Sequence, residues 1–337
     1  MDIWTAILRP CYGRAKALIR GGADLTVVGP AGETPLTLAS RSGPADMVRL
    51  FLKAEVDPDS DPGFPLNAAC ANGRLSSVKV LLKAGANVNR VHPSTGTPLM
   101  YAVLKHHPDI VSLLRRNGAE INATNAAGRS ALHQAASLGL PLEIFFLALH
   151  GADLCATTPI PHELSHYSAP FTPLAHAAHR GHFGIVCHLV EMMEKQGVAK
   201  CDRGLALCTA AASGHMDIIN LLLAHGWDKM EPPKGSSPLL FAIASPNMQP
   251  AIVELFLSRV ADIQATLEPE EMTALHLTAS WGDTGILRYL VRRGANVKAR
   301  TKTKGKTPLH VASRNAYSSH GLKAVRALLN AGADITS

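Results

Sequence analysis

KTPLHVAS, residues 306–313, recurs with variations along the whole chain. The related stretches are GETPLTLAS (32–40), GTPLMYAV (96–103), RSALHQAAS (129–137), FTPLAHAAHRGH (171–182), SSPLLFAIA (236–244) and MTALHLTAS (272–280). Their shared leucine stands at Leu36, Leu66, Leu99, Leu132, Leu174, Leu207, Leu239, Leu275 and Leu309. Successive leucines are therefore 30, 33, 33, 42, 33, 32, 36 and 34 residues apart. Such a period is typical of repeat proteins.

A second pattern fills the space between these phrases. In SSVKVLLKAGANVN (76–89) and DIVSLLRRNGAEIN (109–122), apolar residues at helical spacing precede a glycine and a polar turn. Each repeat is therefore predicted to hold two short helices and an extended loop. Thr-Pro pairs supply a cap and a first-turn proline, and glycines stand where a helix end favours a left-handed residue. Those glycines are Gly85, Gly118, Gly151, Gly226, Gly294 and Gly332.

The T-P-L-H-x-A-A phrase and the G-A-D/N-x-N ending resemble the ankyrin-repeat family over essentially the whole chain. The resemblance implies an all-α solenoid of about ten helix-turn-helix repeats with β-hairpin fingers and a concave groove. We expect a single domain over residues 1–337, with a degenerate N-terminal repeat at 1–30 and a long finger insertion at about 155–170. The stretch at 205–208 departs most from the phrase, reading LALC.

Composition excludes several other classes of protein. Aromatic residues make up 5% of the chain and charged residues 18%, which suits small-faced stacked helices. Six scattered cysteines without C-x-x-C spacing predict neither a zinc ribbon nor a disulfide framework, and they favour a reducing compartment. No apolar run has the length of a membrane span, and no secretory signal pattern opens the chain. We therefore expect a cytoplasmic or nuclear protein without a membrane partner.

Partner-binding positions follow from the resemblance. In the family, the two residues before the glycine that ends the first helix vary and face the groove, and here they include Leu104, Lys105, His179, Arg180, Trp281 and Arg314. The residue after the T-P-L-H position is polar or aromatic in the middle repeats, which suggests a local pocket; the candidates are Tyr101, Gln134, His176 and Phe241. The alternative is ordinary packing, both for these residues and for Trp281. Histidines at the T-P-L-H position itself, such as His276, are expected to be structural.

The stretch PIPHELSHYSAP, residues 159–170, contains the H-E-x-x-H pattern of catalytic zinc sites. The pattern needs a third ligand and a buried helix, and the sequence supplies neither at the usual separation. An alternative function is therefore a metal or small-molecule site in the middle repeats, possibly catalytic through His162, Glu163 and His166. The metal ligands in that case would be His162, His166, His176 and His179. The preferred role of this stretch is a proline-braced interaction loop.

Charge is distributed unevenly. The chain carries a net charge of +7, yet residues 285–337 alone hold eleven lysines and arginines against one acidic residue. The finger KARTKTKGK, residues 298–306, forms a basic patch whose alternation would place its cations on one edge of a hairpin; they are Lys298, Arg300, Lys302, Lys304 and Lys306. An acidic partner could bind there, or the glutamates of the neighbouring finger could neutralise the patch. No aromatic residue interleaves the lysines, so nucleic acid is not expected.

Together these patterns predict a protein-protein interaction scaffold or adaptor that binds an unidentified protein partner along the groove and fingers. We expect no cofactor and no enzymatic activity. The fold does not name the partner, because function depends on the residues displayed on the fold.

Overall fold

In the computed structural model of the chain, the described residues are 3–9, 11–29, 32–59, 63–93, 96–158, 171–202, 204–229, 237–245, 248–259, 262–267, 269–315 and 317–334. They divide into two compact units. The first comprises residues 1–135 and 140–153, and the second comprises residues 136–139 and 154–337. The expected single domain over the whole chain stays a prediction, and each unit is described by itself.

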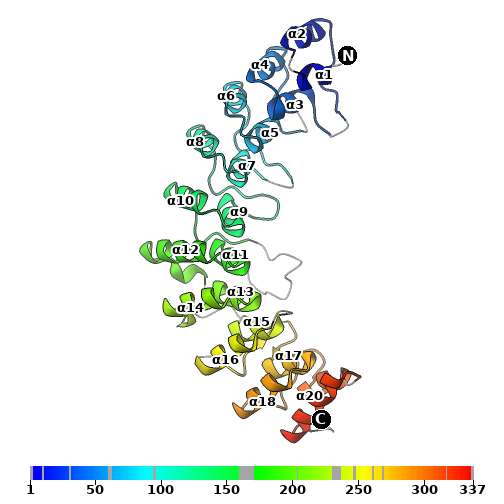
Figure 1. Cartoon of the computed structure of the whole chain (residues 1–337), viewed down its shortest axis with the longest axis vertical. Coiled ribbons are helices and arrows are strands. Elements are labelled where there is room, and N and C mark those ends of the chain that lie inside the picture. Colours follow the sequence, from blue (N-terminus) through cyan, green and yellow to red (C-terminus); the bar gives the residue numbers. More distant parts are fainter. Residues whose placement is uncertain are drawn as a thin grey trace. The chain divides into compact units, whose positions relative to one another are not determined.

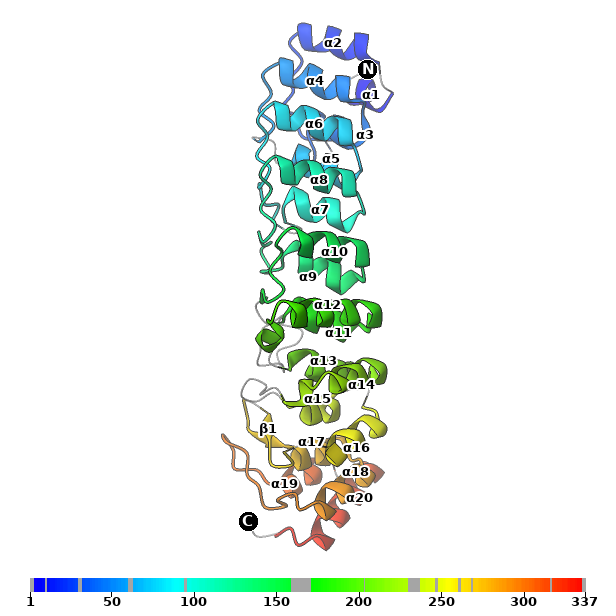
Figure 2. The same ribbon diagram turned by 90° about the vertical axis from the view of Figure 1, so that its left-hand side faces the viewer.

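The first unit is built from consecutive helix pairs (Figure 1). Its helices are α1 (Ile3–Leu8), α2 (Tyr12–Arg20), α3 (Pro35–Ser42), α4 (Ala45–Lys53), α5 (Pro65–Ala71), α6 (Leu75–Lys83), α7 (Pro98–Leu104), α8 (Pro108–Arg116), α9 (Ala131–Leu138) and α10 (Pro141–Leu149), with the end of α9 belonging to the second unit. The first helices α3, α5 and α7 pack on one another, and α2, α4, α6 and α8 form an outer layer (Figure 2). The degenerate first repeat thus supplies a helix pair of its own, α1 and α2.

The second unit repeats this arrangement. Its elements are α11 (Pro173–Arg180), α12 (Phe183–Lys195), η2 (Ala199–Asp202), α13 (Leu205–Ser213), α14 (Met216–Ala224), η3 (Trp227–Lys229), α15 (Pro238–Ala244), α16 (Pro250–Arg259), β1 (Thr266–Leu267), β2 (Met272–Thr273), α17 (Ala274–Trp281), α18 (Thr284–Arg292), α19 (Pro308–Arg314) and α20 (Ser319–Asn330). The first helices α11, α13, α15, α17 and α19 pack in succession. The predicted all-α fold of stacked helix pairs is confirmed.

Local sequence explains where the first helices begin. The hydroxyl of Thr172 accepts a hydrogen bond from the N–H of Ala175, and Pro173 occupies the first helical turn of α11. The same cap recurs at Thr34, Thr97 and Thr307. All six glycines expected in a left-handed conformation have positive φ, between 75° and 88°. In these repeats the threonine cap and the glycine are local signals that mark where the helices begin and end.

The core of each unit is aliphatic and lies between the first and second helices. Leu36, Leu99, Leu132 and Leu174 of the repeated phrase are each at most 1% exposed. Alanines of the first helices, such as Ala39 and Ala177, are fully buried and allow neighbouring helices to approach closely. The small-faced stacking expected from the composition is therefore present.

The fingers of the first unit are tied together by asparagines. The Asn122 side chain donates to the Gly151 carbonyl (3.3 Å) and accepts from the Asp153 N–H (2.9 Å). Asn89 makes the equivalent pair of bonds one repeat earlier, with Gly118 and Glu120. The expected β-hairpins are short: in the described residues, two-residue strands β1 and β2 pair antiparallel, and three single bridges occur elsewhere. Side-chain hydrogen bonds from asparagines thus connect successive fingers of the first unit.

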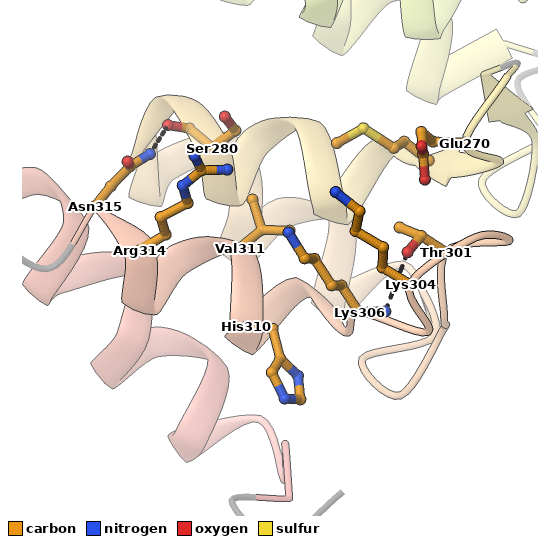
Figure 3. A pocket seen from close by; sticks show the side chains of 10 residues that line it. Glu270, Ser280, Thr301, Lys304, Lys306, His310, Val311, Arg314 and Asn315 are labelled. Atoms are coloured by element: carbon orange, nitrogen blue, oxygen red, sulfur yellow. Dashed lines mark hydrogen bonds between the residues drawn. The ribbon is translucent and has the colours of Figure 1, made fainter.

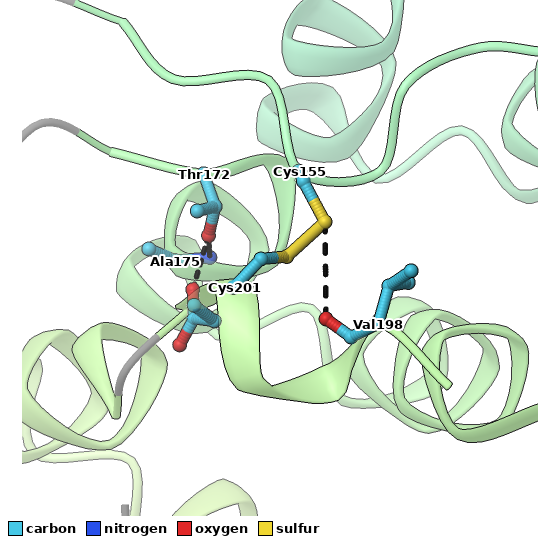
Figure 4. The surroundings of a disulfide bond; sticks show 6 residues. Cys155, Thr172, Ala175, Val198 and Cys201 are labelled. Carbon is cyan, nitrogen blue, oxygen red and sulfur yellow. Dashed lines mark hydrogen bonds between the residues drawn. A yellow bond between two sulfur atoms is a disulfide. The ribbon is translucent and has the colours of Figure 1, made fainter. Parts of the chain in front are cut away.

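A disulfide joins Cys155 to Cys201, with 5.7 Å between their Cα atoms (Figure 4). The prediction of no disulfide was therefore wrong. The two cysteines are 46 residues apart in sequence, and the stacking of α11 and α12 brings the loop after α10 beside η2. The Cys155 Sγ also lies 3.8 Å from the carbonyl oxygen of Val198. Cys11, Cys70, Cys187 and Cys208 are free.

The least regular repeat phrase, residues 205–208, still forms a complete helix, α13. No threonine caps it. Instead the fully buried carboxylate of Asp202 accepts hydrogen bonds from the N–H of Ala206 (2.8 Å) and from the Thr172 hydroxyl. Burial raises the pKa of Asp202 to about 6, although both hydrogen bonds act to lower it. Asp202 of η2 thus caps the start of α13, where the repeated phrase has no threonine.

Candidate functional site

The residues predicted to bind a partner are found in both units. Tyr101, Leu104, Lys105 and Gln134 belong to the first unit. The second unit holds His176, His179, Arg180, Phe241, Trp281 and Arg314. All of them lie on first helices or on the residue directly after one, as the repeat pattern predicted. Their role in binding remains a prediction, and the two groups are considered separately.

In the first unit, Tyr101 belongs to a cluster of rings at the base of two fingers. Its half-buried ring meets His92 edge to face at 6.2 Å, and His92 meets Phe64 in the same way at 4.7 Å. The Arg90 guanidinium lies 4.5 Å from the centre of the Phe64 ring. Phe64, Arg90 and His92 could not be predicted from the repeated phrase, because they belong to loops that it does not describe. The Arg90 guanidinium over the Phe64 ring is a cation–π contact beside α7.

The other predicted residues of this unit differ in exposure. Leu104 is half-buried at the end of α7, while Lys105 after it is exposed. Gln134 is half-buried on α9, with its amide nitrogen 3.9 Å from the Met100 sulfur. Of these three, Lys105 is the most accessible to a partner.

In the second unit, the two candidates for an inner pocket are buried. His176 is 5% exposed and packs edge to face against Phe171, with ring centres 5.2 Å apart. Phe241 is 4% exposed. Both side chains therefore pack in the stack of first helices, which favours the structural interpretation for them.

His179 lies nearer the surface at the end of α11. Its Nδ1 is 2.8 Å from the Ser213 hydroxyl, and its carbonyl lies 3.3 Å from Nε2 of His215 in the next repeat. Burial lowers the pKa of His179, with smaller contributions from Arg180 and His215. The imidazole is therefore neutral at pH 7 and acts as a hydrogen-bonding group, while Arg180 beside it is exposed.

Trp281 is the most accessible large ring among the predicted residues. It is 53% exposed at the end of α17, although the residues from Ala274 to Ala279 of that helix are buried. The neighbouring Gly282 has φ of 76° and ends the helix. A large aromatic side chain held at the surface by a buried helix is typical of a binding position.

The basic finger at 298–306 differs from the predicted hairpin edge. Residues 302–304 form a turn, since the Thr301 N–H donates to the Lys306 carbonyl (2.9 Å) and Gly305 adopts φ of 56°. Lys302 pairs with Glu271 at 2.9 Å, so the expected neutralisation between fingers does occur at this position. Because the chain turns here, its basic side chains do not follow one strand edge.

A pocket of about 560 Å³ lies between this finger and helices α17 and α19 (Figure 3). Lys304 and Lys306 extend into it from the finger, and Arg314 extends from α19 into the same space. Glu270, Ser280 and Asn315 line its walls. The three cations were each predicted to lie on a binding surface, but their position around one pocket does not follow from the sequence pattern.

The metal-site alternative depends on residues outside the described part of the chain. His162, Glu163 and His166 all lie there, so their arrangement stays a prediction. His176 and His179 are described and flank Phe171. Within the described ranges, no group of three or more His, Cys, Asp or Glu side chains is placed to hold a metal ion. Likewise, no helix described here combines the length and apolarity needed to cross a bilayer.

Comparison with known proteins agrees with the geometry. A family model described as ankyrin repeats (3 copies) matches residues 4–92, 90–158, 174–267 and 239–337. The ankyrin repeat and KH domain-containing protein mask-1 of Caenorhabditis elegans is 30% identical over 178 residues, covering 48% of this chain and 6% of the relative. An ankyrin repeat and KH domain-containing protein of Caenorhabditis briggsae is 29% identical over 233 residues, covering 69% of this chain and 7% of the relative.

A third relative is the transient receptor potential cation channel subfamily A member 1 homolog of C. elegans. It is 31% identical over 150 residues, which cover 43% of this chain and 12% of the relative. The chain thus spans a small fraction of the length of each of these relatives. The family model covers most of the sequence, and stacked helix pairs occupy the matched residues. The chain therefore belongs to the ankyrin-repeat family.

Proposed function

We propose that the chain is a non-enzymatic protein-interaction scaffold or adaptor, which binds a protein partner through the ends of its first helices and through its fingers. Ankyrin repeats generally mediate protein-protein interaction, and the variable positions of this chain carry residue types suited to that role. The observation that carries the proposal is the exposure of Trp281 on a helix whose preceding residues are buried.

Binding through such a surface needs little reorganisation. α17 packs between α15 and α19, so the backbone under Trp281 is fixed before a partner arrives. A preorganised aromatic side chain loses little conformational entropy on binding. His179 adds a neutral hydrogen-bonding group on α11, where its Ser213 contact holds the ring in place.

Affinity capture from a native lysate, with the full chain as bait, tests the proposal. The Trp281→Ala variant removes the exposed indole, and Phe145→Ala is the matched control because that ring is also 53% exposed but lies on the outer helix α10. We expect a protein that wild type and Phe145→Ala enrich and that Trp281→Ala loses. Circular dichroism melting curves confirm that each variant remains folded.

Equal capture by all three chains would contradict a role for the end of α17. A metal determination on the purified chain addresses the alternative function. Stoichiometric zinc that disappears in His166→Ala would favour a metal site at the H-E-x-x-H stretch over the scaffold proposed here.

A further inference from the structure

The pocket between the basic finger and α19 gathers positive charge that forms no ion pair with the described residues. Lys304 and Arg314 are exposed and Lys306 is half-buried, and none of the three forms an ion pair with a described residue. In contrast, Lys302 on the same finger is paired with Glu271. Glu270, the carboxylate among the described lining residues, accepts a hydrogen bond from the Thr303 hydroxyl. Three cations therefore line one space, and the described part of the chain provides none of them with an ion-pair partner.

Both walls of the pocket are held in place. On the finger, the Arg300 guanidinium donates to the Gly305 carbonyl (3.1 Å), and the Lys306 N–H donates to the Thr301 hydroxyl (3.0 Å). On the helical side, the Asn315 amide donates to the Ser280 carbonyl (2.7 Å) and ties the end of α19 to α17 (Figure 3). The cations are thus presented by a backbone that is already ordered, which lowers the entropic penalty of binding.

A second hollow, of about 290 Å³, continues from this pocket past Arg314. It shares Ser280, Arg314 and Asn315 with the basic pocket, and Trp281 and Tyr317 line its far side. Tyr317 is fully exposed and Trp281 is 53% exposed. The surface therefore changes from basic to aromatic over a short distance, from the finger to the loop before α20.

We infer that these two hollows bind one acidic peptide segment of a protein partner, with its carboxylates at Lys304, Lys306 and Arg314 and an adjoining apolar side chain at Trp281 and Tyr317. The inference rests on the proposed scaffold function and names the partner chemistry of its C-terminal repeats. Charge complementarity supports it, because residues 285–337 carry a net charge of +10.

The lining favours a peptide over single-stranded nucleic acid. Proteins that bind single strands interleave aromatic stacking platforms with cations along the groove. Here no Phe, Tyr or Trp is found among the described residues that line the basic pocket, and both rings lie at one end. Glu270 in the lining can accept a hydrogen bond from a peptide backbone N–H, a donor that a phosphodiester backbone lacks.

Fluorescence anisotropy with a labelled synthetic peptide tests the inference. The probe alternates glutamate and glycine and ends in phenylalanine; its companion has glutamine in place of every glutamate. The test variant is Lys304→Gln, Lys306→Gln, Arg314→Gln in the full chain. The control variant is Arg292→Gln, Lys323→Gln, Arg326→Gln, which removes the same charge from exposed positions outside both hollows.

We expect wild type to bind the glutamate peptide and not its glutamine companion. The test variant should weaken binding about tenfold or more, since three ion pairs are lost, while the control stays within about twofold. Trp281→Ala should also weaken binding, and by the same factor at low and high salt. The affinity of wild type should fall as salt rises.

Three outcomes would overturn the inference: no binding of the glutamate peptide by wild type, equal loss in the test and control variants, or tighter binding of an oligouridine probe than of the peptide. The first two exclude a local site, and the third assigns the hollows to nucleic acid. The scaffold proposal is judged separately by lysate capture. A protein captured through Trp281 by a chain that ignores the peptide would leave that proposal standing.

Discussion

The carboxylate of Asp202 accepts a 2.8 Å hydrogen bond from the backbone N–H of Ala206, at the start of α13. At α3, α7, α11 and α19 the helix start is capped by the threonine of a Thr-Pro pair. Here the cap comes from a different element, η2, and it carries an ionisable group. The stability of this repeat should therefore depend on pH.

Asp202 gives the first prediction. Its pKa is about 6 in the folded chain against an ordinary 3.8, so between these values the folded state holds more protons than the unfolded state. The free energy of unfolding should therefore fall as pH rises from about 4 to about 6. The side chain of Asp202→Asn does not titrate. Over that pH range, the free energy of unfolding of the variant should therefore rise by up to ~3 kcal/mol relative to that of wild type. Urea unfolding of both chains across the pH range measures this, and parallel profiles would contradict it.

His276 should have the opposite dependence. Its Nε2 donates to the Lys306 carbonyl (2.9 Å), and Nδ1 accepts from the Thr273 N–H (3.2 Å). Burial is the main cause that lowers the pKa of His276 below 6.5. As pH falls, this imidazole therefore binds a proton in the unfolded chain before it does so in the folded chain. The free energy of unfolding should thus decrease as pH falls below about 6.5. NMR titration of the imidazole tests this. His276→Gln keeps a capping side chain without titrating and should reduce the acid sensitivity.

Reduction of the Cys155–Cys201 disulfide should destabilise the second unit. The bond closes a loop over a sequence separation of 46, and its loss should lower the unfolding free energy by ~2–4 kcal/mol. Thermal unfolding with and without reductant measures the change. A Cys155→Ser, Cys201→Ser chain should no longer respond to reductant. Cys187→Ser, which removes a free thiol, should respond as wild type does, and an insensitive wild type would contradict the prediction.

Asn122→Ala should loosen the fingers of the first unit. The change removes the bonds to Gly151 and Asp153, and we expect a loss of ~1–2 kcal/mol. Hydrogen exchange at the Asp153 amide should accelerate, because that N–H loses its acceptor. Asn117→Ala is the comparison, since the Asn117 amide donates to Leu113 within its own helix. Equal exchange at Asp153 in both variants would show that Asn122 does not link the fingers.

The repeat architecture could be predicted from the sequence because its signals are local. Thr307 and Pro308 start α19, and Gly294 ends the preceding helix pair. Each of these residues acts on a helix end only a few residues away in sequence. Features that depend on residues far apart in sequence could not be predicted. Cys155 meets Cys201 only after two helices have stacked, and nothing in the spacing of the cysteines indicates that pair.

In the candidate site too, the position of a residue in its repeat could be predicted, whereas its burial and its neighbours could not. The phrase located Trp281 and Arg314, because both stand at fixed positions relative to the repeat. It could not show that His176 and Phe241 are buried, since burial depends on the size of their neighbours. Nor could it show that Lys304 and Lys306 turn toward Arg314, because Gly305 reverses the chain there.

Thr158 and Phe171, the described residues on either side of segment 159–170, are paired with each other. The Thr158 N–H and hydroxyl both donate to the Phe171 carbonyl, at 2.9 Å and 3.3 Å, and Phe171 is fully buried. The twelve residues from 159 to 170 thus begin and end at a closed junction. Changing the length of a loop between fixed ends adds little to the entropic cost of closing it. The segment should therefore tolerate insertions and replacements. An epitope or a fluorescent reporter could be inserted there while the repeats on both sides keep their register.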